Sequence, residues 1–261
     1  MGERPGYVQE EISALRLGLD LGMTHIDTAE MYGNGCAEKV VGNAIKGRRE
    51  EVFLASKVLP SNASYQGTIA ACERSLKRLQ TDYLDLYLLH WLGRKSLTDT
   101  MGAMEQLVVD GKVRFIGVSN FTVAEIQRAQ AVLADQRIVC NQVCYHLGSR
   151  GIEFSLVPFC QRERIAVVGY SPFEQGHLQL EHGRQKKILT ELASRYGKTP
   201  RQVVLNFLVR NSGVFTIPKA VRCEHVQENA AATGWVFSED DVRRMDDVFQ
   251  PPQNETPLDV I

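Results

Sequence analysis

The chain has 261 residues, of which 44% are hydrophobic and 23% are charged, and this composition excludes a disordered chain, a collagen-like fibre and a coiled coil. With 30 basic residues against 31 acidic ones the net charge is -1, so no basic excess points to nucleic acid or an anionic membrane as a partner. The apolar runs are far shorter than the roughly 20 residues of a membrane span, and segment 1–11 is too polar for a signal peptide. Six scattered cysteines without a C-x-x-C pair argue against a zinc site and favour the reducing cytoplasm.

Short apolar runs rich in β-branched and aromatic residues recur along the chain and predict β-strands. The seven predicted strands are Thr24–Thr28, Val52–Val58, Tyr83–His90, Phe115–Ser119, Val139–Tyr145, Ala166–Ser171 and Val214–Pro218. The stretches between them have helical periodicity, with apolar residues recurring on one face. One such face consists of Ile69, Cys72, Leu76 and Leu79, and a second consists of Leu97, Met101, Met104 and Val108.

Helix start and stop signals support this reading. Thr122 with Glu125 has the spacing of a capping box, and Thr199-Pro200 with Gln202 combines a cap, a first-turn proline and a capping partner. Gly111 follows the helix predicted after Leu97 and is expected to end it in a left-handed conformation.

Strands that alternate with helices indicate parallel β-α-β units. Seven strands in a chain of this length predict an α/β fold, a (β/α)8 TIM barrel in which one strand is missing, as a single domain over residues 1–261. The alternative is a doubly wound sheet, but no G-x-G-x-x-G follows any predicted strand.

Four polar residues lie at or just beyond the ends of three consecutive predicted strands. Asp27 is near the end of the first, Tyr32 follows in its loop, and Lys57 and His90 end the next two. In a barrel, chemistry is found at the carboxyl ends of the strands, so we expect these side chains to meet.

The four residue types match the needs of proton donation to a carbonyl oxygen. A phenol alone is a poor acid at neutral pH. A nearby lysine ammonium stabilises the phenolate, and a carboxylate keeps that lysine charged and in place. A histidine on the next strand can orient the substrate oxygen. With no metal-ligand cluster in the sequence, the reducing equivalent is expected from an organic cofactor.

Six segments, in this order along the chain, resemble the signatures of the aldo-keto reductase family. They are Asp27-Thr28-Ala29-Glu30-Met31-Tyr32-Gly33, Ser56-Lys57, Leu88-Leu89-His90-Trp91, Gly117-Val118-Ser119-Asn120-Phe121, Asn141-Gln142-Val143 and Ile217-Pro218-Lys219. The resemblance implies an NADP(H)-dependent oxidoreductase that interconverts small aldehydes or ketones and alcohols. It implies Tyr32 as the general acid, Asp27 and Lys57 as the residues that tune it, and His90 as the residue that orients the carbonyl. Trp91 is expected to line the substrate pocket with Tyr32 and His90.

The resemblance also implies a cofactor site. Ser119, Asn120 and Gln142 correspond to residues that hold the nicotinamide carboxamide, and Tyr170 to the aromatic residue on which the ring stacks. Ser171 and Phe173 are expected to line the pyrophosphate loop. The residues expected at the adenosine end are Lys219, Arg222, Glu228 and Asn229.

One departure from the family pattern affects the choice of cofactor. Many relatives that use NADPH have an arginine for the 2′-phosphate where this chain has His225, and Ala220 replaces a frequent Ser or Thr. Lys219 and Arg222 remain nearby as sources of positive charge. NADP(H) is therefore the expected cofactor, with NAD(H) as a possible second one.

Two other functions are compatible with parts of the pattern. A regulatory module of the same fold would bind the cofactor with little turnover, and the intact set of Asp27, Tyr32, Lys57 and His90 argues against it. A Schiff-base lyase would use Lys57 as its nucleophile, but the cofactor motifs argue against that function. We expect a monomer.

The two ends of the chain raise separate expectations. The strand at Thr24–Thr28 resembles the family's second, so the first strand is expected upstream of Met1, lost by truncation or a start-site error. The tail Pro251–Ile261 either folds over the barrel mouth or is loose. The polar loop Gln175–Gly183 is expected to be solvated, with a possible position over the cofactor.

Overall fold

The computed structural model describes residues 1–3, 5–176 and 183–260, so most of the loop Gln175–Gly183 lies outside the described residues. The chain divides into two compact units. Unit 1 consists of Met1–Asn141 and Val221–Cys223, and unit 2 of Gln142–Ala220 and Glu224–Ile261.

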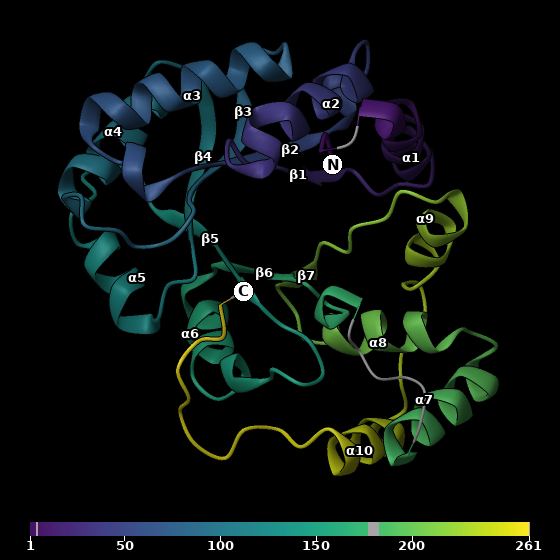
Figure 1. Cartoon of the computed structure of the whole chain (residues 1–261). Coiled ribbons are helices and arrows are strands. Elements are labelled where there is room, and N and C mark those ends of the chain that lie inside the picture. Colours follow the sequence, from purple (N-terminus) through teal and green to yellow (C-terminus); the bar gives the residue numbers. More distant parts are fainter. Residues whose placement is uncertain (4, 177–182, 261) are drawn as a thin grey trace. The chain divides into compact units, whose positions relative to one another are not determined.

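Unit 1 alternates helices with parallel strands (Figure 1). Its strands β1 to β4 pair in chain order and all run parallel. Helices α1 to α4 pack against one another in the same order. The bounds are α1 (Val8–Asp20), β1 (His25–Asp27), α2 (Cys36–Ile45), β2 (Phe53–Val58), α3 (Tyr65–Leu79), β3 (Leu84–Leu89), α4 (Leu97–Val109), β4 (Val113–Ser119), α5 (Val123–Gln130) and β5 (Ile138–Cys144), whose last three residues belong to unit 2.

Unit 2 continues the alternation, with β6 paired parallel to β7. Helix α7 packs against both α8 and α10, and α8 packs against β7 (Figure 1). The bounds are α6 (Leu156–Glu163), β6 (Ala166–Tyr170), α7 (Gly183–Tyr196), α8 (Pro200–Leu208), β7 (Val214–Thr216), α9 (Cys223–Ala230), whose first residue belongs to unit 1, and α10 (Glu239–Val248).

All seven predicted strands are present, and their ends lie within two residues of the predicted ones. The sequence marks them well because strands of a helix-covered parallel sheet are near-continuous apolar runs, and every residue of β3 is buried. Both predicted capping boxes form, at Thr122 with Glu125 and at Thr199 with Gln202. Gly111 follows α4 with φ +70°, as expected for a left-handed helix stop.

The strand register brings the predicted catalytic residues of unit 1 to one end of the sheet. Asp27 lies opposite Ala55, so Lys57, two residues further along β2, projects to the same face as Asp27. Lys57 in turn lies opposite Leu88, two residues before His90. The carboxyl ends of β1, β2 and β3 are therefore adjacent.

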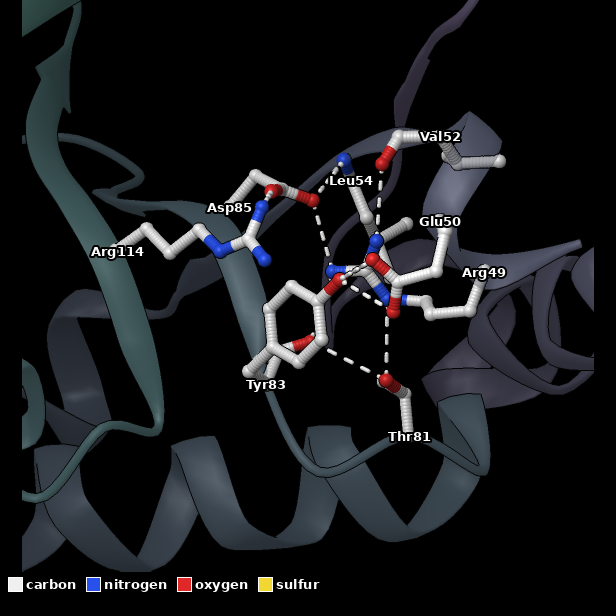
Figure 2. A network of polar contacts seen from close by, with 8 residues as sticks. All are labelled: Arg49, Glu50, Val52, Leu54, Thr81, Tyr83, Asp85 and Arg114. Atoms are coloured by element: carbon white, nitrogen blue, oxygen red, sulfur yellow. Dashed lines mark hydrogen bonds and ion pairs between the residues drawn. The ribbon is translucent and has the colours of Figure 1, made fainter.

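The opposite, amino ends of β2, β3 and β4 are held together around the buried carboxylate of Asp85 (Figure 2). Asp85 Oδ2 accepts hydrogen bonds from Arg49 Nη2 at 2.7 Å and from the Leu54 amide at 2.9 Å, and Oδ1 accepts one from Arg114 Nη1 at 2.9 Å. The carboxylate thus links the segment before β2 to the starts of β3 and β4.

The same network includes a tyrosine ring that contacts two cations. The guanidinium carbons of Arg49 and Arg114 lie 3.8 Å and 4.2 Å from the centre of the Tyr83 ring (Figure 2). The Tyr83 hydroxyl donates to the Glu50 carboxylate at 3.3 Å. Tyr83 therefore contacts both cations through its ring and donates its hydroxyl hydrogen to an acid.

The C-terminal tail is bound to unit 2 and is not loose. Glu255 Oε1 accepts a hydrogen bond from Ser155 Oγ at 3.1 Å, and Asp259 accepts one from Ser149. The side chain of Thr256 lies against Gly151, where an added Cβ would clash with Thr256 Oγ1. The tail is thus held along the segment between β5 and α6.

In the described part of the chain no helix is both long and apolar enough to cross a bilayer. The six cysteines are free thiols. Burial raises the pKa of Cys72 and Cys160 to about 12, so these two thiols are inert packing groups.

Candidate active site

A buried ion pair lies at the carboxyl ends of β1 and β2. Lys57 Nζ is 2.5 Å from Asp27 Oδ1, and it also donates to the carbonyl oxygen of Thr28 at 2.9 Å. The Lys57 side chain is 0% exposed. These contacts hold the ammonium at the base of the site, out of reach of bulk water.

Tyr32 lies on a short turn that returns its hydroxyl to this ion pair. The turn (Tyr32–Gly35) contains left-handed residues, among them Asn34 at φ 51° and Gly35 at φ 84°. At Gly35 the side chain of Arg78 packs so closely that an added Cβ would be 2.7 Å from it. The turn places Tyr32 Oη 3.3 Å from Lys57 Nζ, within hydrogen-bond distance.

His90 follows β3 and completes the group. Its amide donates to the Val58 carbonyl at 3.0 Å, which continues the pairing of β2 with β3. The imidazole lies edge-on to the Tyr32 ring, with 5.6 Å between ring centres. Trp91 packs beside His90 at 4.9 Å and is partly exposed, as expected for a residue at the rim of a site.

The protonation states follow from burial and charge. Burial and the positive charge of Lys57 lower the pKa of His90 to about 4, so the imidazole is neutral at physiological pH. Burial by itself lowers the pKa of Lys57, but the charge of Asp27 and the hydrogen bonds to Asp27 and Tyr32 outweigh it, so the pKa is raised overall. Lys57 is therefore an ammonium, which disfavours the Schiff-base hypothesis because only the free amine is a nucleophile.

Of the predicted cofactor residues, Ser119 and Asn120 lie beside the catalytic group. Ser119 ends β4 and is buried, and Asn120 follows in a left-handed conformation at φ 59°. Asn120 Nδ2 donates to the His90 carbonyl and to Ser119 Oγ, both at 3.3 Å. Next to them Asn141 Nδ2 donates to the Phe121 carbonyl at 2.8 Å, which fixes the loop after β4.

The remaining cofactor candidates are placed separately, mostly in unit 2. Gln142 on β5 and Asn229 on α9 are buried, and Tyr170 at the end of β6 is half-buried. Ser171 follows with a left-handed φ of 54°. Lys219 is exposed, and so is Arg222, which belongs to unit 1.

Arg201 connects two of these candidates, although its position was not singled out in the sequence. Its guanidinium lies 4.1 Å from the centre of the Phe173 ring and 3.6 Å from Glu228 Oε2. The other side of Glu228 accepts a hydrogen bond from Thr199 Oγ1 at 2.5 Å. An arginine one residue after a helix-starting proline gives no sequence signal of such a role.

These residues fit a nicotinamide dinucleotide by their chemistry. The Ser119 hydroxyl and the Asn120 amide are the hydrogen-bonding groups that a carboxamide needs, and they lie next to His90. The exposed cations Lys219 and Arg222 suit phosphate. When bound, such a cofactor supplies a hydride, while the protein supplies the proton and the orientation.

Comparisons with known proteins agree with this arrangement. Residues 7–250 match the model of the aldo/keto reductase family. The chain is 46% identical to methylglyoxal reductase YeaE of Escherichia coli, over 100% of this chain and 92% of the relative, and 38% identical to glyoxal reductase of Bacillus subtilis, over 91% and 83%. A crystal structure of an aldo/keto reductase from Klebsiella pneumoniae, in complex with NADP and acetate, superposes with a TM-score of 0.94 at 46% identity, over 100% of this chain and 92% of that one.

The structural match confirms the (β/α)8 fold class predicted from the strand pattern, and the sequence matches confirm the resemblance read from the motifs. The chain is an oxidoreductase and belongs to the aldo/keto reductase family.

Proposed function

We propose that the protein reduces small aldehydes and ketones, 2-oxoaldehydes such as methylglyoxal among them, to alcohols with NADPH, and that Tyr32 donates the proton. The observation that carries the proposal is the contact between Tyr32 Oη and the Lys57 ammonium at 3.3 Å, with Lys57 itself paired to Asp27. The substrate class is supported by the two relatives named as methylglyoxal and glyoxal reductases.

The assignment of Tyr32 as proton donor follows from a comparison of Lys57, His90 and Tyr32. Lys57 is completely buried and cannot touch a substrate. His90 is neutral because its pKa is about 4, and a neutral imidazole is a poor acid but a good hydrogen-bond donor to a carbonyl oxygen. Tyr32 is half-buried, and the ammonium at its oxygen stabilises the charge that forms when the proton leaves.

The cofactor assignment rests on the residues that correspond to the family's cofactor motifs. Ser119, Asn120 and Gln142 hold the carboxamide, Tyr170 stacks on the ring, and Ser171 and Phe173 contact the pyrophosphate. Lys219, Arg222, Glu228 and Asn229 take the adenosine end. The Klebsiella pneumoniae relative was crystallised with NADP, and a second structure from that organism, 47% identical, with NADPH. NADPH is preferred over NADH because Lys219 and Arg222 offer charge to the 2′-phosphate.

Two further features are part of the proposal. The chain is a single domain that acts as a monomer. The protein works in the cytoplasm, where its six free cysteines stay reduced.

The test is a panel of carbonyl substrates, read as NADPH consumption with identification of the product. The expected result is turnover of methylglyoxal and glyoxal with NADPH, at a higher kcat/KM than with NADH. NADPH binding that quenches fluorescence without consumption of NADPH by any aldehyde or ketone would contradict the proposal and favour a cofactor-binding module.

A further inference from the structure

Glu30 lies between Asp27 and Tyr32 in the sequence, and its carboxylate is buried. Its side chain is 6% exposed. Its amide donates to the Lys57 carbonyl at 3.4 Å, so the backbone that leads from β1 to Tyr32 runs along the end of β2. Glu30 therefore lies where the segments carrying Tyr32 and Lys57 meet.

The carboxylate of Glu30 binds the loop after β2. Oε1 accepts a hydrogen bond from the Leu59 amide at 2.8 Å and one from Asn62 Nδ2 at 3.0 Å. Oε2 is 3.6 Å from Arg74 Nη2, a half-exposed cation on α3. Because the Arg74 contact is long and solvated, the two hydrogen bonds to the loop are the stronger restraint.

The same loop is packed against the segment that follows His90. An added Cβ on Gly93 would be 2.5 Å from Pro60 Cβ, so this segment packs closely on the Pro60 ring because residue 93 is glycine. The His90 amide also donates to the Val58 carbonyl at 3.0 Å, directly before Leu59. A restraint on the loop at Leu59–Asn62 is therefore transmitted to the segments of all three residues, Tyr32, Lys57 and His90.

We propose that Glu30 is a positioning residue, whose carboxylate fixes the loop of Tyr32 to the end of β2 and so sets the approach of Tyr32 Oη to Lys57 Nζ. The proposal rests on the function proposed above. It requires no contact between Glu30 and the substrate or cofactor. Loss of the carboxylate frees the Tyr32 segment from the Leu59–Asn62 loop, and displacement of a catalytic group by about 1 Å can cost ~100-fold in rate.

The experiment compares Glu30→Ala with Glu30→Gln and with a matched control. Glutamine keeps an oxygen acceptor for the Leu59 amide, and alanine does not. The control is Glu105→Ala, because Glu105 Oε1 likewise accepts backbone hydrogen bonds, from Ala134, Asp135 and Gln136 at 2.9–3.0 Å. That carboxylate restrains the loop before β5, away from Tyr32.

For methylglyoxal reduction we expect Glu30→Ala to lower kcat by about 10–100-fold, with KM and the Kd for NADPH within about twofold of the original values. Glu30→Gln is expected to retain most of kcat, and Glu105→Ala all of it, even if both alanine variants lose similar thermal stability. Unchanged kcat in Glu30→Ala, or an equal loss in Glu105→Ala, would overturn the proposal.

A second readout needs no turnover. In protein labelled with 13C at the tyrosine phenol carbon, the Tyr32 resonance, assigned by its loss in Tyr32→Phe, reports the contact with Lys57. It should shift in Glu30→Ala and not in Glu105→Ala. An unshifted Tyr32 resonance refutes the role of Glu30, whereas a shifted resonance in a protein that reduces no carbonyl would uphold the positioning and refute the proposed function.

Discussion

The two ends of the sheet in unit 1 combine the same three chemical groups in different ways. At the amino ends of β2–β4, Asp85 is bonded to Arg49 and Arg114, and both guanidinium groups contact the Tyr83 ring. At the carboxyl ends of β1–β3, Asp27 is bonded to Lys57, which contacts a tyrosine through its hydroxyl.

The two tyrosines differ in the hydrogen-bond partner of the hydroxyl group, and this partner decides whether the tyrosine can act as a proton donor. The Tyr83 hydroxyl donates its hydrogen to the acid Glu50 at 3.3 Å. The Tyr32 oxygen instead accepts a hydrogen bond from the Lys57 ammonium at 3.3 Å, so the Tyr32 hydroxyl hydrogen remains available for a substrate. Tyrosine, carboxylate and cation are present at both ends, and at the carboxyl ends the cation is hydrogen-bonded to the tyrosine oxygen.

The largest effect is expected when the buried cation at the carboxyl ends is removed. Lys57→Met takes away the charge at Tyr32 Oη and should lower kcat by about 10³-fold, within the usual range for general acid catalysis. It also leaves Asp27 buried without its partner ammonium, so the melting temperature should fall. Steady-state kinetics and thermal denaturation measure the two effects.

Arg49→Met is the matched change at the amino ends. It should lower the melting temperature by a similar amount, because Asp85 loses one of its two cations, and leave kcat unchanged. A loss of kcat in Arg49→Met comparable to that in Lys57→Met would show that stability, not the charge at Tyr32, controls the rate.

The next largest effect concerns the Asp85 network. Asp85→Asn should reduce the free energy of unfolding by about 2–4 kcal/mol, because Arg49 is mostly buried and keeps its charge without a carboxylate. Arg114 is half-exposed, so water solvates its guanidinium when the carboxylate is lost, and Arg114 adds little to the loss of stability. Urea denaturation gives the stability, and kcat measured where the variant is folded should equal that of the parent. An unchanged denaturation midpoint would contradict the structural role of Asp85.

The smallest effect is the pH dependence of stability. The pKa of His90 is about 4 in the folded protein against 6.5 unfolded, and burial also lowers that of His25. Between these values the unfolded chain binds protons that the folded chain does not, so stability is fully present above pH 6.5 and falls as the pH drops toward about 4. For His90 the loss is at most about 3 kcal/mol. His90→Gln should flatten this slope, and an equal slope in His90→Gln would refute the assignment.

The strands were predictable from the sequence because each is a buried apolar run between amphipathic helices. The differences lie at strand ends, as at Val214–Pro218, where the observed strand stops at Thr216. Proline has no amide hydrogen to extend a ladder, so the apolar pattern overran the hydrogen-bonded part. The capping boxes were predictable because their partners are three residues apart.

The meeting of Asp27, Lys57 and His90 was predictable because each lies at or next to a strand end, and that of Tyr32 because it follows in the loop of a quoted motif. Glu30 lies inside a quoted motif, but its partners Leu59 and Asn62 are about 30 residues away, and no local pattern indicates the pairing. The same holds for Arg49 and Asp85, which are brought together by the strand register. Such contacts follow from the fold and have no periodic signal.

The most direct test of the account compares Tyr32→Phe with Tyr83→Phe in single-turnover reduction of methylglyoxal by NADPH. Tyr32→Phe should lower the rate by about 10²–10⁴-fold and leave the Kd for NADPH unchanged, because it removes only the proton donor. Tyr83→Phe should keep the rate, because the ring faces that contact Arg49 and Arg114 remain. A Tyr32→Phe enzyme that reduces methylglyoxal at the original rate would contradict the assignment of Tyr32 as proton donor.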